Sequence, residues 1–207
     1  MDLIVESPIN SLSFGNVSYN ILRQLWRKGV NVMWYPTSGN SDFASFGKID
    51  KDFGSWLQDS SRNANSKIDR ETPSFKLWHL NGSQSRIGSK QALYTFYELD
   101  QPTPEEVNLA KFQNLVFFSS NYSADKFREL GVDAKVIPVG FDEDFHKTNK
   151  KTVSMTAVRP PARFGAIKFN GNKVSYFKEK SKLDEGWING GFFVFEPKFL
   201  RLIKDDK

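Results

Sequence analysis

The feature that most constrains this sequence is a regular alternation of short apolar runs with helix-like segments along its first two thirds. The apolar runs have the length and bounding residues of buried strands. They are Leu3–Glu6, Val30–Tyr35, Phe75–Leu80, Ala92–Leu99, Leu115–Phe118 and Lys135–Val139. Strand and helix alternation of this kind predicts an α/β fold with a doubly wound, mostly parallel sheet.

The segments between these runs carry helix signals. Residues 17–28 place apolar side chains on one face and end at Gly29. A second helix is expected after Ser120 or Asn121, either of which can cap it, and Gly131 ends it. The long polar stretch from Thr37 to Thr72 offers one possible helix, around Phe53–Leu57.

Ligands of such sheets bind beyond the carboxyl ends of the strands. Three loops are therefore expected at that edge: Ser11–Asn16, His79–Ser83 and Glu98–Thr103. Gly15 precedes the first predicted helix, where a glycine allows the main chain to approach a ligand closely or simply makes a turn. His79 ends a predicted strand, so it is a candidate functional side chain or a histidine held by an ordinary hydrogen bond.

Several functional classes are excluded by what the sequence lacks. The chain has no cysteine, no Gly-x-Gly and no Gly-x-x-x-x-Gly-Lys, which removes disulfides, the dinucleotide fingerprint and the P-loop. Its two histidines, His79 and His146, have no metal-ligand spacing, so no metal site is predicted.

The sequence also indicates where the protein resides. No apolar run is long enough to span a membrane, and Glu6 stands where a signal peptide requires a basic residue. We therefore expect a cytoplasmic protein whose Asn-x-Ser sites are unused.

Charge divides the chain into two unlike parts. Residues 1–149 have a net charge of −2, whereas residues 150–207 have a net charge of +7. The basic residues of the second part alternate with apolar ones, as on a solvated strand face, so no nucleic-acid partner is expected. This shift places a junction at residues 147–151, between a first domain at 1–146 and a second segment at 152–207.

The second segment reads as strands. Runs at 152–158, 164–169, 173–180 and 187–195 have strand composition, and Asn170-Gly171 is a hairpin signal. Asn189, Gly190 and Gly191 interrupt an apolar run, which suits a close approach of main chain and ligand. Glu179 and Lys180 end a strand together. They could bind sugar hydroxyls and a phosphate, or they could be two exposed edge residues.

Two resemblances follow from longer strings. The runs Phe75–Ser83, Phe96–Asp100, Val116–Ala124 and Val136–Asp142 resemble, in that order, the N-terminal half of a GT-B glycosyltransferase. That resemblance implies that the Gly15 loop and His79 face an acceptor or a transferred sugar. The half that would bind the nucleotide sugar in that family is missing, so binding without turnover is expected.

The second resemblance covers about 55 residues of the tail. Met155–Ala166, Phe177–Lys180 and above all Gly186–Val194 are similar to the central part of glucose-1-phosphate cytidylyltransferase. It implies that Glu179 and Asn189–Gly191 contact glucose and that Lys180 contacts the sugar phosphate. The family's Gly-rich loop and its Mg²⁺-binding aspartate are not in the sequence, so no cofactor is expected in this chain.

Both resemblances indicate nucleotide-sugar and carbohydrate metabolism, with a sugar phosphate or nucleotide sugar as ligand. The first hypothesis is a truncated fusion of a partial glycosyltransferase domain with a β-rich nucleotidyltransferase-like fragment, weakly active or inactive alone. The alternatives are a transferase that catalyses cytidylyl or sugar transfer with a partner chain, and a non-catalytic carbohydrate-binding module. Strands that lack their usual neighbours would also favour self-association.

Overall fold

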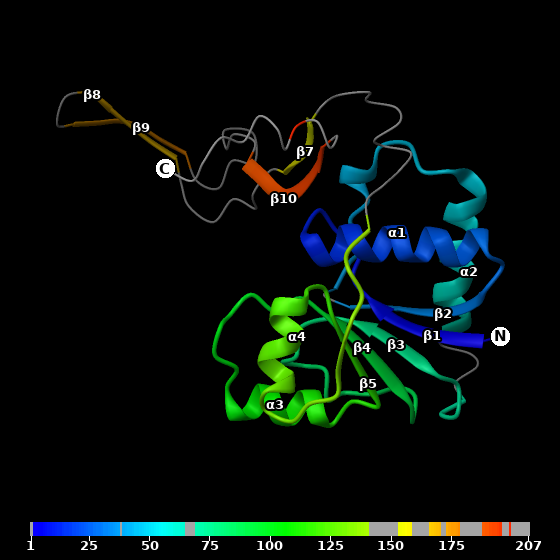
Figure 1. Ribbon diagram of the computed structural model, residues 1–207. Coiled ribbons are helices and arrows are strands. Elements are labelled where there is room, and N and C mark those ends of the chain that lie inside the picture. The colour runs from blue at the N-terminus through cyan, green and yellow to red at the C-terminus, as the bar shows by residue number, and fades with distance from the viewer. Residues whose placement is uncertain are drawn as a thin grey trace. The chain divides into compact units, whose positions relative to one another are not determined.

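Six parallel strands form the sheet around which the first 140 residues fold in a computed structural model of the chain (Figure 1). The structure describes residues 2–37, 39–64, 69–140, 153–158, 166–170, 173–178 and 188–195, together with Phe199. Backbone contacts divide the chain into two units, Met1–Gly140 and Phe141–Lys207. The junction predicted at residues 147–151 lies outside the described residues.

The first unit alternates strands and helices as the sequence predicts. Its elements are β1 (Asp2–Ser7), α1 (Ser13–Arg27), β2 (Asn31–Pro36), η1 (Ala44–Phe46), α2 (Lys51–Ala64), β3 (Ser74–Leu77), β4 (Gln91–Thr95), α3 (Pro104–Lys111), β5 (Leu115–Phe118), α4 (Asn121–Arg128) and β6 (Ala134–Val136). The strand order is β2-β1-β3-β4-β5-β6, and every neighbouring pair is parallel. The predicted α/β fold with a mostly parallel sheet is confirmed.

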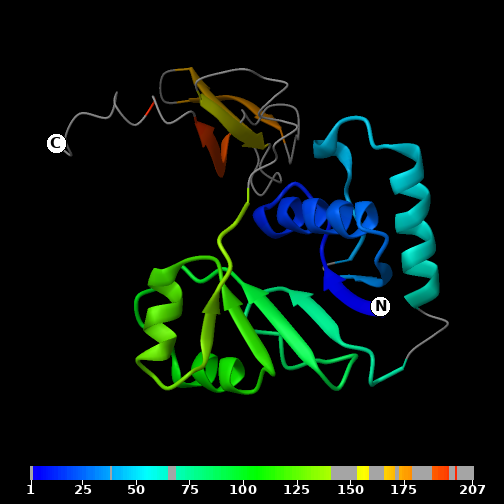
Figure 2. The same ribbon diagram turned by 45° about the vertical axis from the view of Figure 1, so that its right-hand side comes forward.

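Helices cover both faces of this sheet. The neighbours Leu93 and Tyr94 on β4 point to opposite faces because successive strand residues alternate. Tyr94 packs with Phe14 of α1, whereas Leu93 packs with Phe127 of α4. The sheet is therefore doubly wound, with α1 on one face and α3 and α4 on the other (Figures 1 and 2).

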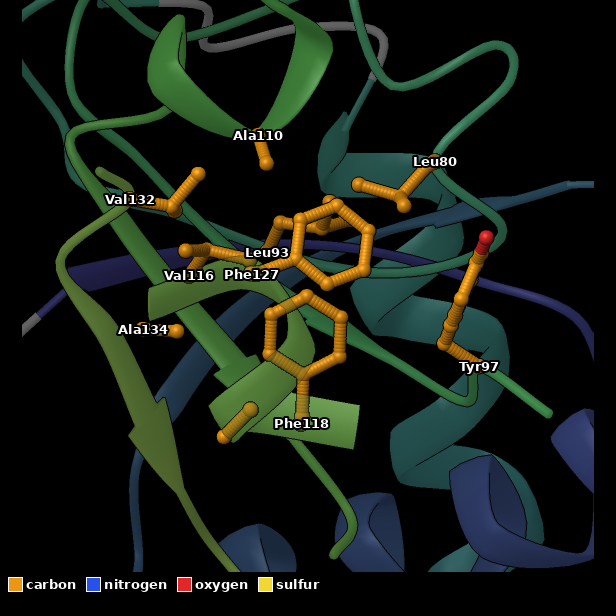
Figure 3. Packing of buried hydrophobic residues seen from close by; sticks show 10 residues of the cluster. Leu80, Leu93, Tyr97, Ala110, Val116, Phe118, Phe127, Val132 and Ala134 are labelled. Atoms are coloured by element: carbon orange, nitrogen blue, oxygen red, sulfur yellow. The ribbon is translucent and has the colours of Figure 1, made fainter. Parts of the chain in front are cut away.

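The core beneath α3 and α4 is built on stacked aromatic rings. The ring centroids of Phe118 and Phe127 lie 4.6 Å apart with an interplanar angle of 26°, and neither side chain is exposed to solvent. Tyr97 meets Phe127 edge to face at 4.9 Å, at the margin of the same cluster (Figure 3). These large rings fill the space between the sheet and the two short helices.

The predicted helix ends are partly right. Gly29 and Gly131 follow α1 and α4 with φ of 66° and 78°, as expected of glycines that end helices. Ser120 caps α4, since its side chain accepts a hydrogen bond from the N–H of Ser123. Helix α2 is longer than the predicted 53–57, and the Asp50 carboxylate caps its start by accepting hydrogen bonds from the N–H groups of Asp52 and Phe53.

The second unit is described in its four strands and at Phe199. They are β7 (Val153–Val158), β8 (Ala166–Asn170), β9 (Lys173–Lys178) and β10 (Ile188–Phe195). Among the described residues, β10 pairs with β7 and β8 pairs with β9, both antiparallel. Asn170 opposes Lys173, so the pairing that the Asn170-Gly171 signal predicts is present.

Candidate functional site

The strand order defines where a ligand would approach the first unit. From β1 the chain moves to β2 on one side and then returns to β3 on the other side of β1. The connection after β1 leads toward one edge of the sheet, and the connection after β3 leads toward the other edge. Where two neighbouring parallel strands send the chain in opposite directions, a crevice opens at their carboxyl ends. The segments that follow β1 and β3 therefore form the expected binding edge.

An aromatic cluster lies at this edge, formed by Phe14, Trp78, His79 and Phe96. Phe14 from the first turn of α1 stacks on Phe96 with centroids 4.5 Å apart, and it meets the His79 ring edge on at 4.6 Å. Trp78 also contacts His79 edge on, at 5.6 Å. The structure thus brings together two of the loops that the sequence marks, those that contain Gly15 and His79.

His79 is exposed on this cluster. Among the described residues, its imidazole has ring contacts and no hydrogen-bond partner. Both interpretations of His79, as a functional side chain and as a structural histidine, stay predictions. An exposed imidazole against apolar rings can donate and accept hydrogen bonds with a ligand that covers the cluster.

The loop that carries His79 is held by a buried amide network. The amide nitrogen of Gln91 donates to the carbonyl oxygen of Ser83 at 2.9 Å and to the side chain of Gln113 at 2.7 Å. Gln113 donates in turn to the Ser83 hydroxyl at 3.1 Å, and Ser83 is fully buried. Because buried polar groups with partners fix their surroundings, this network defines the path of residues 79–83.

A buried ion pair contacts the segment that directly follows this loop. Nζ of Lys76 on β3 lies 3.1 Å from a carboxylate oxygen of Glu6 on β1, and both side chains are less than a tenth exposed. Lys76 also donates to the carbonyl oxygen of Ser85 at 2.8 Å and to its hydroxyl at 3.0 Å. Burial, followed by the Glu6 carboxylate, raises the pKa of the neighbouring Tyr35 phenol. Sequence reasoning missed this pair, although a charged residue inside each apolar strand was a signal for it.

Gly15 lies within the first turn of α1, because that helix begins at Ser13 and not at the predicted residue 17. It is buried, and a Cβ there would overlap with the main chain of Asn10. Asn10 also accepts a hydrogen bond from the N–H of Leu12 at 3.0 Å. The close approach that Gly15 permits is therefore between two parts of this chain, and a role toward a ligand stays a prediction.

The third predicted loop, Glu98–Thr103, leads into α3, a helix that sequence reasoning missed. Thr103 caps it through a reciprocal pair of hydrogen bonds with Glu106, and Pro104 occupies the first turn. The Tyr97 hydroxyl donates to the Glu106 carboxylate at 3.0 Å. Burial, together with Glu106, raises the pKa of Tyr97 to about 12. The Thr-Pro-Glu-Glu string was the signal that could have revealed α3.

In the second unit, Asn189, Gly190 and Gly191 all lie on β10. Asn189 opposes Ala157, and the next paired residue, Phe193, opposes Met155. Three β10 residues thus stand opposite one residue of β7, so the pairing is irregular where the two glycines occur. Glu179 and Lys180 lie outside the described residues.

No metal site emerges from the residues that the structure describes. Three or more Asp, Glu or His side chains do not come together anywhere within them. Within the same residues, no helix is both long and apolar enough to cross a membrane.

Comparison with known proteins finds a similarity at the C-terminal end of the chain. A protein-family model described as nucleotidyl transferase matches residues 133–207. This match begins at β6 of the first sheet and continues through all the described strands of the second unit. The C-terminal third of the chain is thus similar to nucleotidyltransferases.

Two curated relatives show which nucleotidyltransferases this part of the chain is similar to. Glucose-1-phosphate cytidylyltransferases from Salmonella typhimurium and Salmonella typhi are each 48% identical to this chain over 63 residues. The match covers 30% of this chain and 24% of each relative. The chain therefore spans about a quarter of the length of the curated relatives it matches.

Proposed function

We propose that this chain acts in nucleotide-sugar metabolism and that its second unit binds a hexose 1-phosphate. The observation that carries the proposal is the 48% identity with glucose-1-phosphate cytidylyltransferases over 63 residues. Identity this high over 63 residues supports a shared local structure and the ligand that this structure holds. Glucose 1-phosphate is the substrate that the name of these relatives implies.

The irregular strand β10 supports the location of the binding site. Between Asn189 and Phe193 the pairing with β7 is interrupted, so main-chain groups of Gly190 and Gly191 are not engaged in a regular ladder. Glycine lets a ligand approach such groups closely, and the Asn189 amide supplies a donor and an acceptor for sugar hydroxyls. We assign Glu179 to the sugar hydroxyls and Lys180 to the phosphate, on the basis of their place in the similar string.

Calorimetric titration of the full chain with glucose 1-phosphate tests this proposal. Lys180→Ala should weaken binding roughly tenfold to a hundredfold, because a charge-assisted hydrogen bond contributes about 1.5–3 kcal/mol. Lys173→Ala is the matched control, since it removes an equal charge from an exposed position on β9. Equal affinities for both variants, or no binding to the parent chain, would refute the assignment.

Catalysis is a separate question from binding. We propose that the chain binds without turnover unless another chain supplies the nucleotide-binding and metal-binding groups. Adding CTP, glucose 1-phosphate and Mg²⁺ should then yield no pyrophosphate from the isolated chain. Pyrophosphate release at a steady rate would instead favour the alternative, a cytidylyltransferase active by itself or through self-assembly.

A second candidate function belongs to the first unit. We propose that Met1–Gly140 is a glycosyltransferase-like domain whose aromatic cluster binds a sugar, and the contact between Phe14 and His79 favours this candidate. His79→Ala should weaken the binding of a sugar acceptor, whereas Asn81→Ala, an exposed change in the same loop, should not. Calorimetric titration with the sugar measures this difference, because the emission of Trp78 would be mixed with that of the four other tryptophans.

The strand edges suggest a role for a second chain. Among the described residues, β7 pairs with β10 alone and β8 with β9 alone, so each small sheet has two edges without a neighbour there. Such edges favour pairing with another chain. Sedimentation velocity at several concentrations should show reversible self-association, and a monomer at every concentration would contradict it.

A further inference from the structure

A pocket that the proposed function does not use opens beside the edge strand β2. Its volume is about 640 Å³, within the range of small-molecule sites. It lies between the end of β2, the segment around η1 and one face of α2, which stands alongside β2 in both views of the unit (Figures 1 and 2). None of the four residues of the aromatic cluster lines it.

The floor of the pocket is apolar. Trp34 of β2 and Leu57 of α2 lie at its base, and both are almost fully buried in the core of this half of the sheet. Phe43, from the segment before η1, adds a partly buried ring. The Trp34 indole N–H already donates to the carbonyl oxygen of Ser7 at 3.1 Å. The floor of the pocket is therefore apolar, and the indole N–H of Trp34 is not available to a ligand because it is already bonded to Ser7.

One wall of the pocket is polar and comes from a single helix. Gly54, Gln58 and Ser61 of α2 line the pocket, and their spacing places them on one face of the helix. Ser55 lines the pocket beside them. Hydroxyl and carboxamide groups both donate and accept hydrogen bonds, so this wall suits a ligand with many hydroxyl groups.

At the start of α2 the pocket lining includes an acid, Asp50, and a base, Lys51. Asp50 caps α2, since its carboxylate accepts hydrogen bonds from the N–H groups of Asp52 and Phe53 at 2.9 and 3.1 Å. The exposed Lys51 lies at the first turn of the same helix. A negatively charged substituent on the ligand would meet Lys51 near the positive end of the helix dipole.

Gly54 keeps the pocket open. A glycine inside a helix is about 1 kcal/mol less favourable than alanine. A Cβ at this position would meet a single atom within 4 Å, Cγ2 of Ile49 at 3.9 Å. Packing therefore does not demand a glycine here, and the space that a side chain would occupy belongs to the pocket.

We propose that this pocket binds a sugar ring, with one apolar face of the ring on the partly buried Phe43, next to the buried Trp34, and its hydroxyls toward Ser55, Gln58 and Ser61. Carbohydrates combine apolar C–H faces with a rim of hydroxyls, and this lining has both features in the same arrangement. The inference goes beyond the proposed function, because the pocket belongs to the first unit and shares no residue with the sugar-phosphate site on β10.

A free sugar and a sugar phosphate both carry the apolar ring face and the hydroxyls that this pocket would bind. Titration of the full chain with each of them shows which one the pocket prefers. D-glucose, glucose 1-phosphate and cytidine serve as probes, with a tail variant, Lys180→Ala, as the background that weakens the site on the second unit. Both sugars should bind in this background, glucose 1-phosphate more tightly if its phosphate meets Lys51. Binding of cytidine alone, or of no probe at millimolar concentration, would overturn the proposal.

Variants along α2 locate the bound sugar. Gly54→Leu fills the pocket and should abolish binding, and Gln58→Ala should weaken it roughly tenfold through a lost hydrogen bond. Gly54→Ala should raise the unfolding temperature while lowering affinity, a split that a purely structural glycine would not give. Asp59→Ala is the control, because Asp59 is an exposed residue of the same helix that does not line the pocket. If Gly54→Leu fails to fold, an unchanged affinity in Gln58→Ala and Gly54→Ala would overturn the proposal.

Discussion

The two units of this chain differ in what supports each of them. Met1–Gly140 has a six-stranded parallel sheet with helices on both faces and several buried clusters. The described strands of Phe141–Lys207 form two separate two-stranded sheets. The curated relatives match 63 residues, and the family match covers 133–207, mostly in the second unit.

This difference separates the part of the chain whose core is described from the part that known proteins match. A short stretch that surrounds a ligand can stay similar to an enzyme because its residue types are fixed by that ligand. A two-stranded sheet by itself, however, is marginally stable in water at best. We therefore expect the first unit to supply most of the folding free energy and the second unit to supply the sugar-phosphate specificity.

The largest expected effect comes from separating the two units. Residues 1–140 produced alone should unfold in one cooperative thermal transition, because the sheet and its helices are contained within them. Residues 141–207 produced alone should show no cooperative transition. Circular dichroism during heating distinguishes these outcomes. A cooperative transition in residues 141–207 would contradict the expectation that the first unit supplies most of the folding free energy.

A large effect is expected in the core of the first unit. Phe127→Ala removes a fully buried ring that stacks on Phe118 and should lower the free energy of unfolding by about 3–5 kcal/mol. Phe112→Ala is the matched control, because the Phe112 side chain is 55% exposed. Its effect should be below about 1 kcal/mol, from a contact with the Arg86 guanidinium. Similar losses measured by urea denaturation would argue against the assigned core.

The buried ion pair predicts a non-additive effect of comparable size. Lys76→Met leaves the Glu6 carboxylate buried without a partner, which typically costs about 3–5 kcal/mol. The double variant Glu6→Gln with Lys76→Met should recover part of this loss, because it also removes the unpaired charge. Urea denaturation of the four proteins of this cycle gives the coupling, and strictly additive losses would contradict a direct interaction.

Much of the first unit could be predicted from the sequence because local signals agree with the fold there. The apolar run Leu115–Phe118 coincides with β5, and Gly29 and Gly131 follow their helices. Helix α3 was missed because its apolar face is weak, although Thr103 and Glu106 form its cap. The start of α1 was predicted late because Gly15 resembled a turn residue.

The candidate site was predictable in its position and not in its contacts. His79 could be placed at the carboxyl edge from the strand pattern alone. Its contact with Phe14, and the support from Gln113, join residues far apart in the sequence, and no local pattern encodes such a meeting. The irregular pairing of β10 agrees with the expectation that Gly190 and Gly191 interrupt a strand, and the ligand expected beside them stays a prediction.

A smaller effect should appear at alkaline pH in the first unit. Burial raises the pKa of Tyr94 to about 12, and burial together with Glu106 raises that of Tyr97 to about 12. In the unfolded chain both phenols titrate near the ordinary value of about 10. Between these values the unfolded state has lost protons that the folded state retains, so stability should fall as the pH rises from about 10 to 12. Urea denaturation at pH 9, 10 and 11 should show this decline, and Tyr97→Phe should reduce it.

The most direct test of the division between the units is a titration of the isotope-labelled full chain with glucose 1-phosphate, followed by amide NMR. In the Gly54→Leu background, which closes the pocket beside α2, the account predicts shifts at Asn189, Gly190 and Gly191 and none along α2. Shifts confined to the first unit, with those three amides unmoved, would contradict it.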